Sequence, residues 1–509
     1  MIREPMNDGP LLARRAVLRL FAAGTTVTAA GLLAGCGRIP GFGRSADKAA
    51  PLTVERWRAT RGETYQIAHR GAGDVLPEHS LAAYQAALDW GATCVEISVD
   101  MTSDGVLVCM HDLTLNRTTS GKGLVADHTY ATLAAVGIEA PQLGPGWLVP
   151  PLPAVPRLED VLDLVDGRAV MCIEAKADAA YEPMIAMIEK HGLKDSVIVK
   201  LFRGTPRIAE AKAAGYPVFV YLANPDMSPQ ILARTAAALD PARDYLVIPA
   251  TTGDAITYHP DEVVRAAVAT GVPVWVYPIH RRSDFAHHTA LGVRGAVSSS
   301  IGYTTGVASI SRIDDWASKK VDAGQVSRRP DDPSMAPEWT GVDELTLARG
   351  SGRQEFVMLG QFCPLVNAAT TYEIRFAASW TQPPTGSTTN FTLAFGHVDD
   401  TYYEHKYGKS TGYHAIMRPA GQLELYLHLA GRKDGTLLRS IVTPPVVAGT
   451  WMTFSLIVNG DVLTWTRTDV PDHPSVLVKD TTIRGGYIHV GRSSTDGRGV
   501  LAVRQFRVV

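Results

Sequence analysis

The chain has 509 residues, which is too long for one ordinary hydrophobic core and indicates two or three domains. Its 49 basic residues nearly balance its 51 acidic residues, so no strong overall field favours nucleic acid or an anionic membrane surface as a partner. Hydrophobic residues make up 46% of the chain and charged residues 20%, a globular composition that confines the predicted disorder to linkers.

Residues 1–36 have the features of an export signal and are set apart from the fold. The segment RRAVLR resembles the twin-arginine export motif, and the run LFAAGTTVTAAGLLAG that follows is too short and too polar for a stable membrane span. The segment ends in LAGC, which resembles a bacterial lipobox with its cysteine at Cys36. We therefore predict an exported lipoprotein, anchored by lipid on the outer face of the bacterial cell membrane. The alternative is a plain signal peptide with an incidental cysteine, and hence a secreted protein.

A Gly-, Arg- and Ala-rich tether at 37–62 precedes a region, 63–312, in which short apolar runs alternate with helical patterns. Helical patterns at 182–192, 205–215 and 261–271 each end in the glycine expected just beyond a helix. This alternation predicts a parallel (β/α)8 TIM barrel, with an open doubly wound sheet as the alternative. The eight predicted strands are 65–71, 94–100, 169–176, 196–202, 217–224, 244–250, 272–279 and 293–300.

Residues 313–339 are charged and rich in proline, and we interpret them as a linker. Beyond them, at 340–509, the patterns become those of strands. The run QLELYLHL alternates leucines with polar residues, and two further runs meet at Asn459-Gly460, which is a strong hairpin signal. We predict an all-β sandwich for this region. The stretch 451–491 resembles concanavalin-like or laminin-G-like sandwiches.

Polar and charged side chains follow the first three predicted barrel strands. Parallel strands of a barrel end on one rim, where the active sites of this fold lie. Glu96, Ser98 and Asp100 share one face of the second strand, because side chains alternate between faces. Two histidines, several acids, an arginine and a lysine therefore converge on this rim. The other members are His69, Arg70, His111, Asp112, Glu174 and Lys176.

Residues 63–305 resemble the glycerophosphodiester phosphodiesterases. The stretch 67–119 follows the family's order of HRG, a PEN-like turn, an E-x-D strand, a T-x-D-G turn, HD and RTT, and IEAK at 173–176 matches a later acid and lysine. The resemblance implies hydrolysis of glycerophosphodiesters through paired acid and base catalysis. A glycerol hydroxyl beside the ester attacks phosphorus, and water then opens the cyclic phosphate.

The resemblance also implies a role for each matching residue. His69 and His111 match the two histidines, and imidazole can move protons in both directions near neutral pH. Glu96 and Glu174 match carboxylates that bind a divalent cation, and oxygen ligands suit Ca or Mg. In the family, positive charge beside the phosphate, matched here at Arg70 and Lys176, stabilises charge in the transition state.

The chain departs from the family pattern at three positions. The second acid of E-x-D is Ser98, a neutral hydroxyl and a poor ligand for a hard cation. Either Ser98 acts on the metal through a bound water, which we favour, or Asp100 supplies the missing charge; Asp100 meeting Arg70 or solvent is the structural alternative. His79 stands where the turn has Asn, and Ser299 where an Asp is expected, so specificity is expected to differ from that for simple glycerophosphodiesters.

Two functional hypotheses follow. The first is a metal-dependent phosphodiesterase acting on glycerophosphodiesters, lysophospholipids or glycerol phosphate polymers of the envelope. The second is a catalytically weak or inactive barrel that serves as a cell-envelope binding protein, which Ser98 and Ser299 favour. We expect the sandwich either to bind a cell-wall glycan or to be a packing module that supports the barrel. Glycan binding would use tyrosines that stack on sugar faces, namely Tyr402, Tyr403, Tyr407 and Tyr413.

Overall fold

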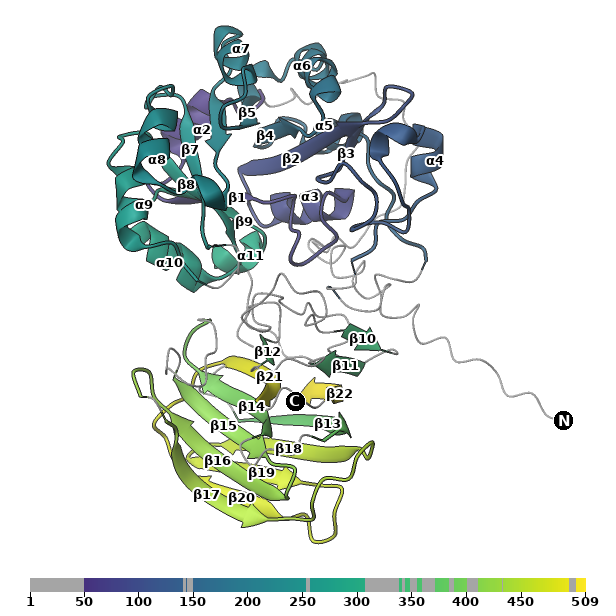
Figure 1. Cartoon of the computed structure of the whole chain (residues 1–509), viewed down its shortest axis with the longest axis vertical. Coiled ribbons are helices and arrows are strands. Elements are labelled where there is room, and N and C mark those ends of the chain that lie inside the picture. Colours follow the sequence, from purple (N-terminus) through teal and green to yellow (C-terminus); the bar gives the residue numbers. More distant parts are fainter. Residues whose placement is uncertain are drawn as a thin grey trace, which may run out of the picture. The chain divides into compact units, whose positions relative to one another are not determined.

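The computed structural model describes residues 50–140, 143, 150–252, 257–306, 338–340, 344–347, 355–358, 371–383, 389–400, 411–432, 434–493 and 500–509. A closed barrel of parallel strands is followed by antiparallel β-sheets (Figure 1), which confirms the predicted fold class. Within these residues no helix is both long and apolar enough to cross a bilayer. The predicted signal segment with Cys36, residues 37–49 of the tether and most of the linker lie outside the described residues. The remainder of the predicted tether contains a helix, α2 (Val54–Thr60), whose Val54 and Trp57 are buried in a core of the barrel, so the tether prediction was wrong for this part.

Eight parallel strands form the barrel, and the first of them closes it by pairing with both the last and the second. Every one of them falls on a run predicted from apolar residues. A short strand, β3 (Leu107–Cys109), pairs antiparallel with β2 and leads to the segment that carries His111. The parallel strands are β1 (Tyr65–Ala68), β2 (Cys94–Met101), β4 (Val170–Ala175), β5 (Val197–Phe202), β6 (Val218–Tyr221), β7 (Tyr245–Pro249), β8 (Val274–Ile279) and β9 (Gly295–Ser298).

Helices connect these strands and pack around the barrel (Figure 1). The helical patterns predicted at 182–192, 205–215 and 261–271 are α6, α7 and α9. The helices are α2 (Val54–Thr60), α3 (Leu81–Asp89), α4 (Tyr130–Ala134), α5 (Leu158–Val165), α6 (Tyr181–Lys190), α7 (Arg207–Ala213), α8 (Pro229–Ala236), α9 (Asp261–Val268), α10 (Arg282–Ala290) and α11 (Ile301–Thr304).

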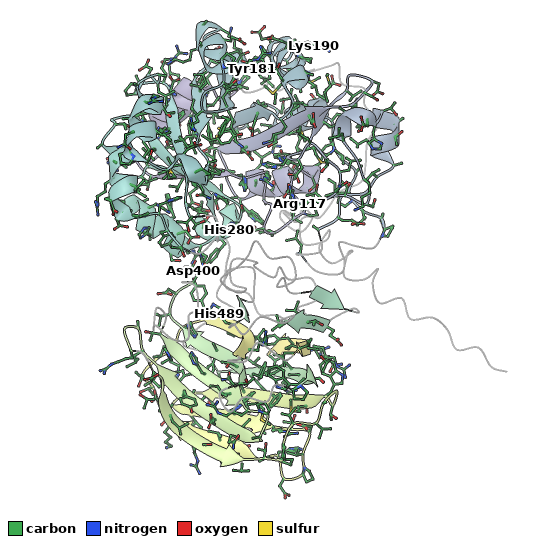
Figure 2. All side chains as sticks on the ribbon, in the orientation of Figure 1. Arg117, Tyr181, Lys190, His280, Asp400 and His489 are labelled. Carbon is green, nitrogen blue, oxygen red and sulfur yellow. The ribbon has the colours of Figure 1, made fainter. Side chains whose placement is uncertain are left out.

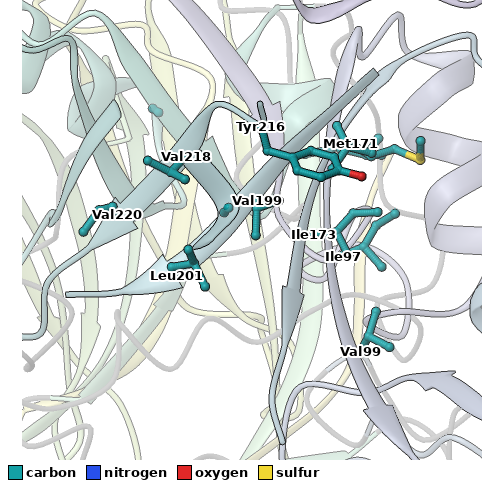
Figure 3. Close-up of a cluster of buried hydrophobic side chains, with 14 of the residues drawn as sticks. Ile97, Val99, Met171, Ile173, Val199, Leu201, Tyr216, Val218 and Val220 are labelled. Carbon is teal, nitrogen blue, oxygen red and sulfur yellow. The ribbon is translucent and has the colours of Figure 1, made fainter. Parts of the chain in front are cut away.

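The outward faces of the strands supply one hydrophobic core. Side chains at alternate positions of β2, β4, β5 and β6, among them Ile97, Ile173 and Val199, cluster on this face (Figure 3). Apolar side chains of the helices belong to the same cluster. The period of two along a strand therefore places the intervening residues, such as Glu96 and Glu174, on the inward face.

The inward face divides into an apolar layer and a polar layer. Trp275 of β8 is fully buried, and its ring lies 5.6 Å from that of Tyr65, 5.2 Å from Phe219 and 4.3 Å from Tyr245. These rings occupy the part of the interior toward the start of the strands. The charged residues follow at the carboxyl ends, where the fold places active sites.

The closure of the barrel is uneven at β1. This strand pairs with β9 from Tyr65 to Ala68, but with β2 only through Ala68 and Val95. The residues that follow β1 therefore lie beside the least extensive pairing of the barrel.

The C-terminal region is a β-sandwich of two antiparallel sheets, as predicted. One sheet contains β10 (Glu338–Thr340), β11 (Glu344–Leu347), β22 (Val500–Val508), β13 (Tyr372–Gln382), β18 (Met452–Asn459), β19 (Val462–Arg467) and β20 (Ser475–Lys479). The other contains β12 (Glu355–Met358), β21 (Tyr487–Ser493), β14 (Asn390–His397), β15 (Gly412–Met417), β16 (Gln422–His428) and β17 (Thr436–Val442).

Apolar side chains from both sheets share the core of the sandwich. The rings of Phe376 and Phe391, one from each sheet, lie 5.2 Å apart. The predicted hairpin at Asn459-Gly460 joins β18 and β19. Tyr413, one of the tyrosines expected to bind a glycan, is fully buried, so that expectation was wrong for this residue. The other three tyrosines lie outside the described residues.

Candidate active site

His69 follows β1 directly and reaches Ser299, which follows β9. The distance from His69 Nδ1 to Ser299 Oγ is 2.7 Å. Burial lowers the pKa of His69 well below its usual value, with the charge of Arg70 acting in the same direction. Ser299, the residue that departs from the expected acid, therefore holds the ring of the first candidate histidine.

Arg70 and Gly71 form a tight turn after the first strand. Both have positive φ angles, 53° and 82°. A Cβ on Gly71 would lie 2.8 Å from a backbone carbon of Ala83 in α3, so only glycine fits here. The turn aims the backbone N–H of Arg70 at Glu96 Oε2, 2.9 Å away, and the Arg70 guanidinium donates to Glu78 at 2.9 Å.

Two buried carboxylates hold one ammonium group between them. Lys200 Nζ lies 2.6 Å from Glu96 Oε1 and 2.8 Å from Glu174 Oε2. Burial is the largest single influence and would raise the pKa of both carboxyl groups, but the surrounding donors and cations, Lys200 foremost, together hold both below their usual values. Burial alone would lower the pKa of Lys200, but the two carboxylates raise it above its usual value. All three groups are therefore charged near neutral pH.

Two further side chains complete the shell around Glu174. Its Oε2 also accepts from Lys176 Nζ at 3.2 Å, and its Oε1 accepts from the Tyr221 hydroxyl at 2.6 Å. Burial lowers the pKa of Lys176, whereas Glu174 opposes this effect. Lys176 lies at the rim, as the resemblance implied, and is only partly exposed.

Ser98 and Asp100 lie on the same strand as Glu96, but among the described residues neither side chain makes a hydrogen bond to Glu96, Glu174 or Lys200. Ser98 Oγ is buried and finds no hydrogen-bond partner within the described part of the chain. Asp100 is buried, and its Oδ1 accepts the backbone N–H of Met101 at 2.8 Å. Burial also raises the pKa of Asp100. The carboxylate of Asp100 thus accepts from the backbone of the next residue, and Lys176 is the charged group that acts on it.

The second candidate histidine, His111, is held by an acid. Its Nδ1 lies 2.8 Å from Asp112 Oδ1, and Arg117 (Figure 2) binds both Asp112 and Glu78. Burial lowers the pKa of His111, whereas the hydrogen bond to Asp112 raises it in part. An Nδ1–H donated to the carboxylate leaves Nε2 as the proton-accepting atom of the neutral ring.

His79, in the turn before α3, has a structural role. Its Nδ1 lies 2.6 Å from the hydroxyl of Tyr84, and both residues are buried. Its φ of 58° is one that Asn tolerates more readily than most residues. The departure from the family turn therefore places a neutral imidazole under the rim.

The structure brings most of the predicted residues together around the carboxylate pair. Lys200 and Tyr221 belong to the cluster but were not predicted. A signal existed for Lys200, because it is the one charged residue of the apolar run SVIVKLF and shares the inward parity of Ile198. Among the described residues, no group of three or more His, Cys, Asp or Glu is placed to hold a metal ion.

Comparison with known proteins gives the family of the barrel region. Residues 69–302 match the Glycerophosphoryl diester phosphodiesterase family. A glycerophosphodiester phosphodiesterase of Bacillus subtilis is 30% identical over 254 residues, covering 46% of this chain and 82% of the relative. A probable glycerophosphodiester phosphodiesterase 1 of Mycobacterium tuberculosis is 53% identical over 72 residues, covering 14% of this chain and 26% of the relative.

Among solved structures, the crystal structure of a glycerophosphodiester phosphodiesterase from Agrobacterium tumefaciens is similar to the barrel. It is 22% identical, with a TM-score of 0.38, and the alignment covers 48% of this chain and 99% of that one.

Proposed function

Because this chain belongs to the glycerophosphoryl diester phosphodiesterase family, we propose that it hydrolyses glycerophosphodiesters to an alcohol and a glycerol phosphate through His69 and His111. One observation carries the proposal. Each histidine is fixed through Nδ1, one by Ser299 and the other by Asp112, beside a cluster of buried charges. Fixed imidazoles of this kind are suited to paired proton transfer.

The proton balance requires both histidines. In the first step one imidazole takes the proton of the substrate's neighbouring hydroxyl as its oxygen attacks phosphorus. The other, protonated, gives its proton to the departing alcohol oxygen as that P–O bond breaks, and a cyclic phosphate remains. Water then attacks phosphorus and the two histidines exchange roles, so one water is consumed and both return to their first state.

The cations of the rim supply charge stabilisation. Lys176 is partly exposed at 16% of its side chain, and the Arg70 guanidinium is positioned by Glu78. Negative charge grows on the phosphate oxygens as the new bond forms. Fixed positive charge in a partly dehydrated site stabilises that state more than the ground state.

The divalent cation implied by the family does not fit the donors of this chain. Glu96 and Glu174 already bind an ammonium group, Ser98 is neutral, and Asp100 is turned to a backbone N–H. Ca²⁺ takes six to eight oxygen ligands and Mg²⁺ demands a near-octahedral set. The proposed mechanism therefore routes no step through a metal.

A cavity of about 300 Å³ lies at the carboxyl ends of β6, β7 and β8. We propose that it holds the alcohol group of the substrate, and its size then favours a small alcohol. Asn224, Thr251 and Tyr277 contribute to its lining. Its volume is at the lower limit of ordinary ligand sites. We propose a glycerophosphodiester with a small headgroup as the main substrate, with lysophospholipids and chain ends of glycerol phosphate polymers as larger alternatives.

The test uses the chain from residue 37 onward and glycerophosphocholine. We expect choline release, a loss of roughly 100- to 10,000-fold in kcat for His69→Ala and for His111→Ala, and little change for the control His191→Ala at the end of α6. A substrate analogue that lacks the neighbouring hydroxyl should not react. Activity retained in both site variants would contradict the mechanism, and no activity on any phosphodiester would favour the inactive, envelope-binding alternative.

We also propose export and lipidation at Cys36, for which the signal motifs are the support. Labelling of the full chain with radioactive palmitate in a bacterial host should be lost in Cys36→Ser. Labelling that persists in this variant would contradict the anchor.

The sandwich is proposed to bind a cell-wall glycan through Tyr402 and Tyr403. The full chain should then bind purified wall, and alanine at both positions should weaken that binding. If the double variant binds the wall as well as the intact chain does, or if the intact chain does not bind the wall, the sandwich is better explained as a packing module that supports the barrel.

A further inference from the structure

Lys200 lies where the family resemblance places a divalent cation. It projects from β5 into the barrel, with 9% of its side chain exposed, and bridges the two carboxylates that match metal ligands. The Glu96 carboxylate is completely buried, so this contact is not a transient surface ion pair.

Every oxygen of the two carboxylates already accepts from a donor of the protein. Glu96 Oε1 accepts from Lys200 and Oε2 from the backbone N–H of Arg70. Glu174 Oε1 accepts from Tyr221, and Oε2 lies 2.8 Å from Lys200 Nζ. A metal ion would have to displace these donors, whereas the ammonium group fits the arrangement as it stands.

The net charge of this cluster equals that of the family pattern, because the changes at Ser98 and Lys200 offset each other. The family pattern has three carboxylates around a cation of charge two, which leaves a net charge of minus one. Here Ser98 removes one negative charge, and Lys200 contributes a single positive charge in place of two. Glu96, Glu174 and Lys200 together again carry minus one. The departure at Ser98 is therefore matched by the lysine across the site.

We propose that the Lys200 ammonium replaces the divalent cation, so that this phosphodiesterase acts on its substrate without a metal. The inference rests on the proposed function and deepens it. An ammonium group has three N–H donors, and Glu96 and Glu174 take two of them. The third is available to a phosphate oxygen of the substrate, where the positive charge stabilises the pentacoordinate transition state.

The test combines chelation with calorimetry on the chain from residue 37 onward. After treatment with EDTA, wild-type activity on glycerophosphocholine should be retained, and titration with CaCl₂, MgCl₂ or MnCl₂ should give no binding heat at the site. Lys200→Ala should lose at least roughly 100-fold in kcat, as expected for a group that stabilises transition-state charge. The matched control, Lys190→Ala on the exposed end of α6 (Figure 2), should behave as the wild type.

A double variant, Ser98→Asp with Lys200→Ser, should convert the site to metal dependence. It should bind one divalent cation by calorimetry and recover activity only when that cation is present. If the variant fails to fold, as judged by circular dichroism, the wild-type measurements still decide the matter.

Two outcomes would overturn the proposal: wild-type activity that disappears on chelation and returns with a divalent cation, or a cation that binds the wild type but not Glu96→Gln. The absence of activity under every condition would refute the proposed function instead. In that case the calorimetric titrations still report whether Lys200 or a metal occupies the site.

Discussion

Replacing Lys200 by methionine should lower the free energy of unfolding of the barrel by about 3 to 5 kcal/mol near neutral pH, the cost of breaking a buried ion pair from one side. The substitution leaves Glu96 and Glu174 without the ammonium that lies 2.6 and 2.8 Å from them. Methionine has nearly the same length and volume, so the loss reports the missing charge rather than a cavity. Lys176 lies 3.2 Å from Glu174, and although its charge also acts on Glu96, it makes no hydrogen bond to Glu96 among the described residues, so it compensates Glu96 only in part.

A double-mutant cycle separates this charge effect from other causes. Glu96→Gln alone should also lower the free energy of unfolding of the barrel. In the Lys200→Met background the same change should raise that free energy by at least about 2 kcal/mol, because the neutral amide needs no cation. Urea unfolding followed by tryptophan fluorescence and circular dichroism gives the free energies. The exposed Lys190→Met serves as the control and should change stability by less than about 0.5 kcal/mol.

The reasoning would be refuted if Lys200→Met cost less than about 1 kcal/mol, or if the losses of the two single variants simply added in the double variant. Either result would mean that the charges of Lys200 and Glu96 are compensated by groups other than each other.

Three further predictions concern His79 and the partners of the candidate catalytic histidines. Burial lowers the pKa of His79 to about 3, whereas an unfolded histidine titrates near 6.5. As the pH falls, the unfolded chain therefore takes up this proton before the folded chain does. The free energy of unfolding of the barrel should fall by roughly 1.4 kcal/mol per pH unit below about pH 6.5. Urea titrations of His79→Asn should show a slope shallower by that amount, and an unchanged slope would contradict the assignment. Ser299→Ala removes the partner of His69 and should lower kcat roughly 5- to 10-fold with KM unchanged, with recovery in Ser299→Thr; a rise in KM alone would argue for a substrate contact instead. Asp112→Asn removes the group that raises the pKa of His111, so the limb of the kcat/KM profile that reports His111 should move to lower pH while kcat falls roughly 10- to 100-fold; a profile in which neither limb moves would exclude this role.

The barrel could be predicted because its strands are buried on both faces and are separated by helices with clear ends. Such strands appear as apolar runs, and each of the eight runs formed a strand. The short β3 was not separated from its loop, because Leu107–Cys109 is too brief for a period to be recognised. The sandwich followed from the alternation in β16 and from the hairpin at Asn459-Gly460.

The site was only partly predictable, because its charge balance depends on residues from strands far apart in sequence. His69, Glu96 and Glu174 could be placed by motif, but the partner of both acids is Lys200, which belongs to no motif. Whether Asp100 would bend into the site depended on a local contact with Met101 that a strand pattern cannot show. The burial of Tyr413 likewise depends on which sheet face β15 turns inward.

The sparse pairing between β1 and β2 links closure of the barrel to the occupancy of its site. The strands β1 and β2 pair only through Ala68 and Val95. The hydrogen bond from the Arg70 backbone to Glu96 is a second contact across this junction between the two strands. Local opening of a protein proceeds first where few contacts must break. A phosphate held by Arg70 in the turn after β1 and by Lys200, which binds Glu96 of β2, would connect the two strands, and its binding energy would be added to that of closing the ring. The amides along this junction are therefore the place where solvent exchange should slow most when substrate is bound.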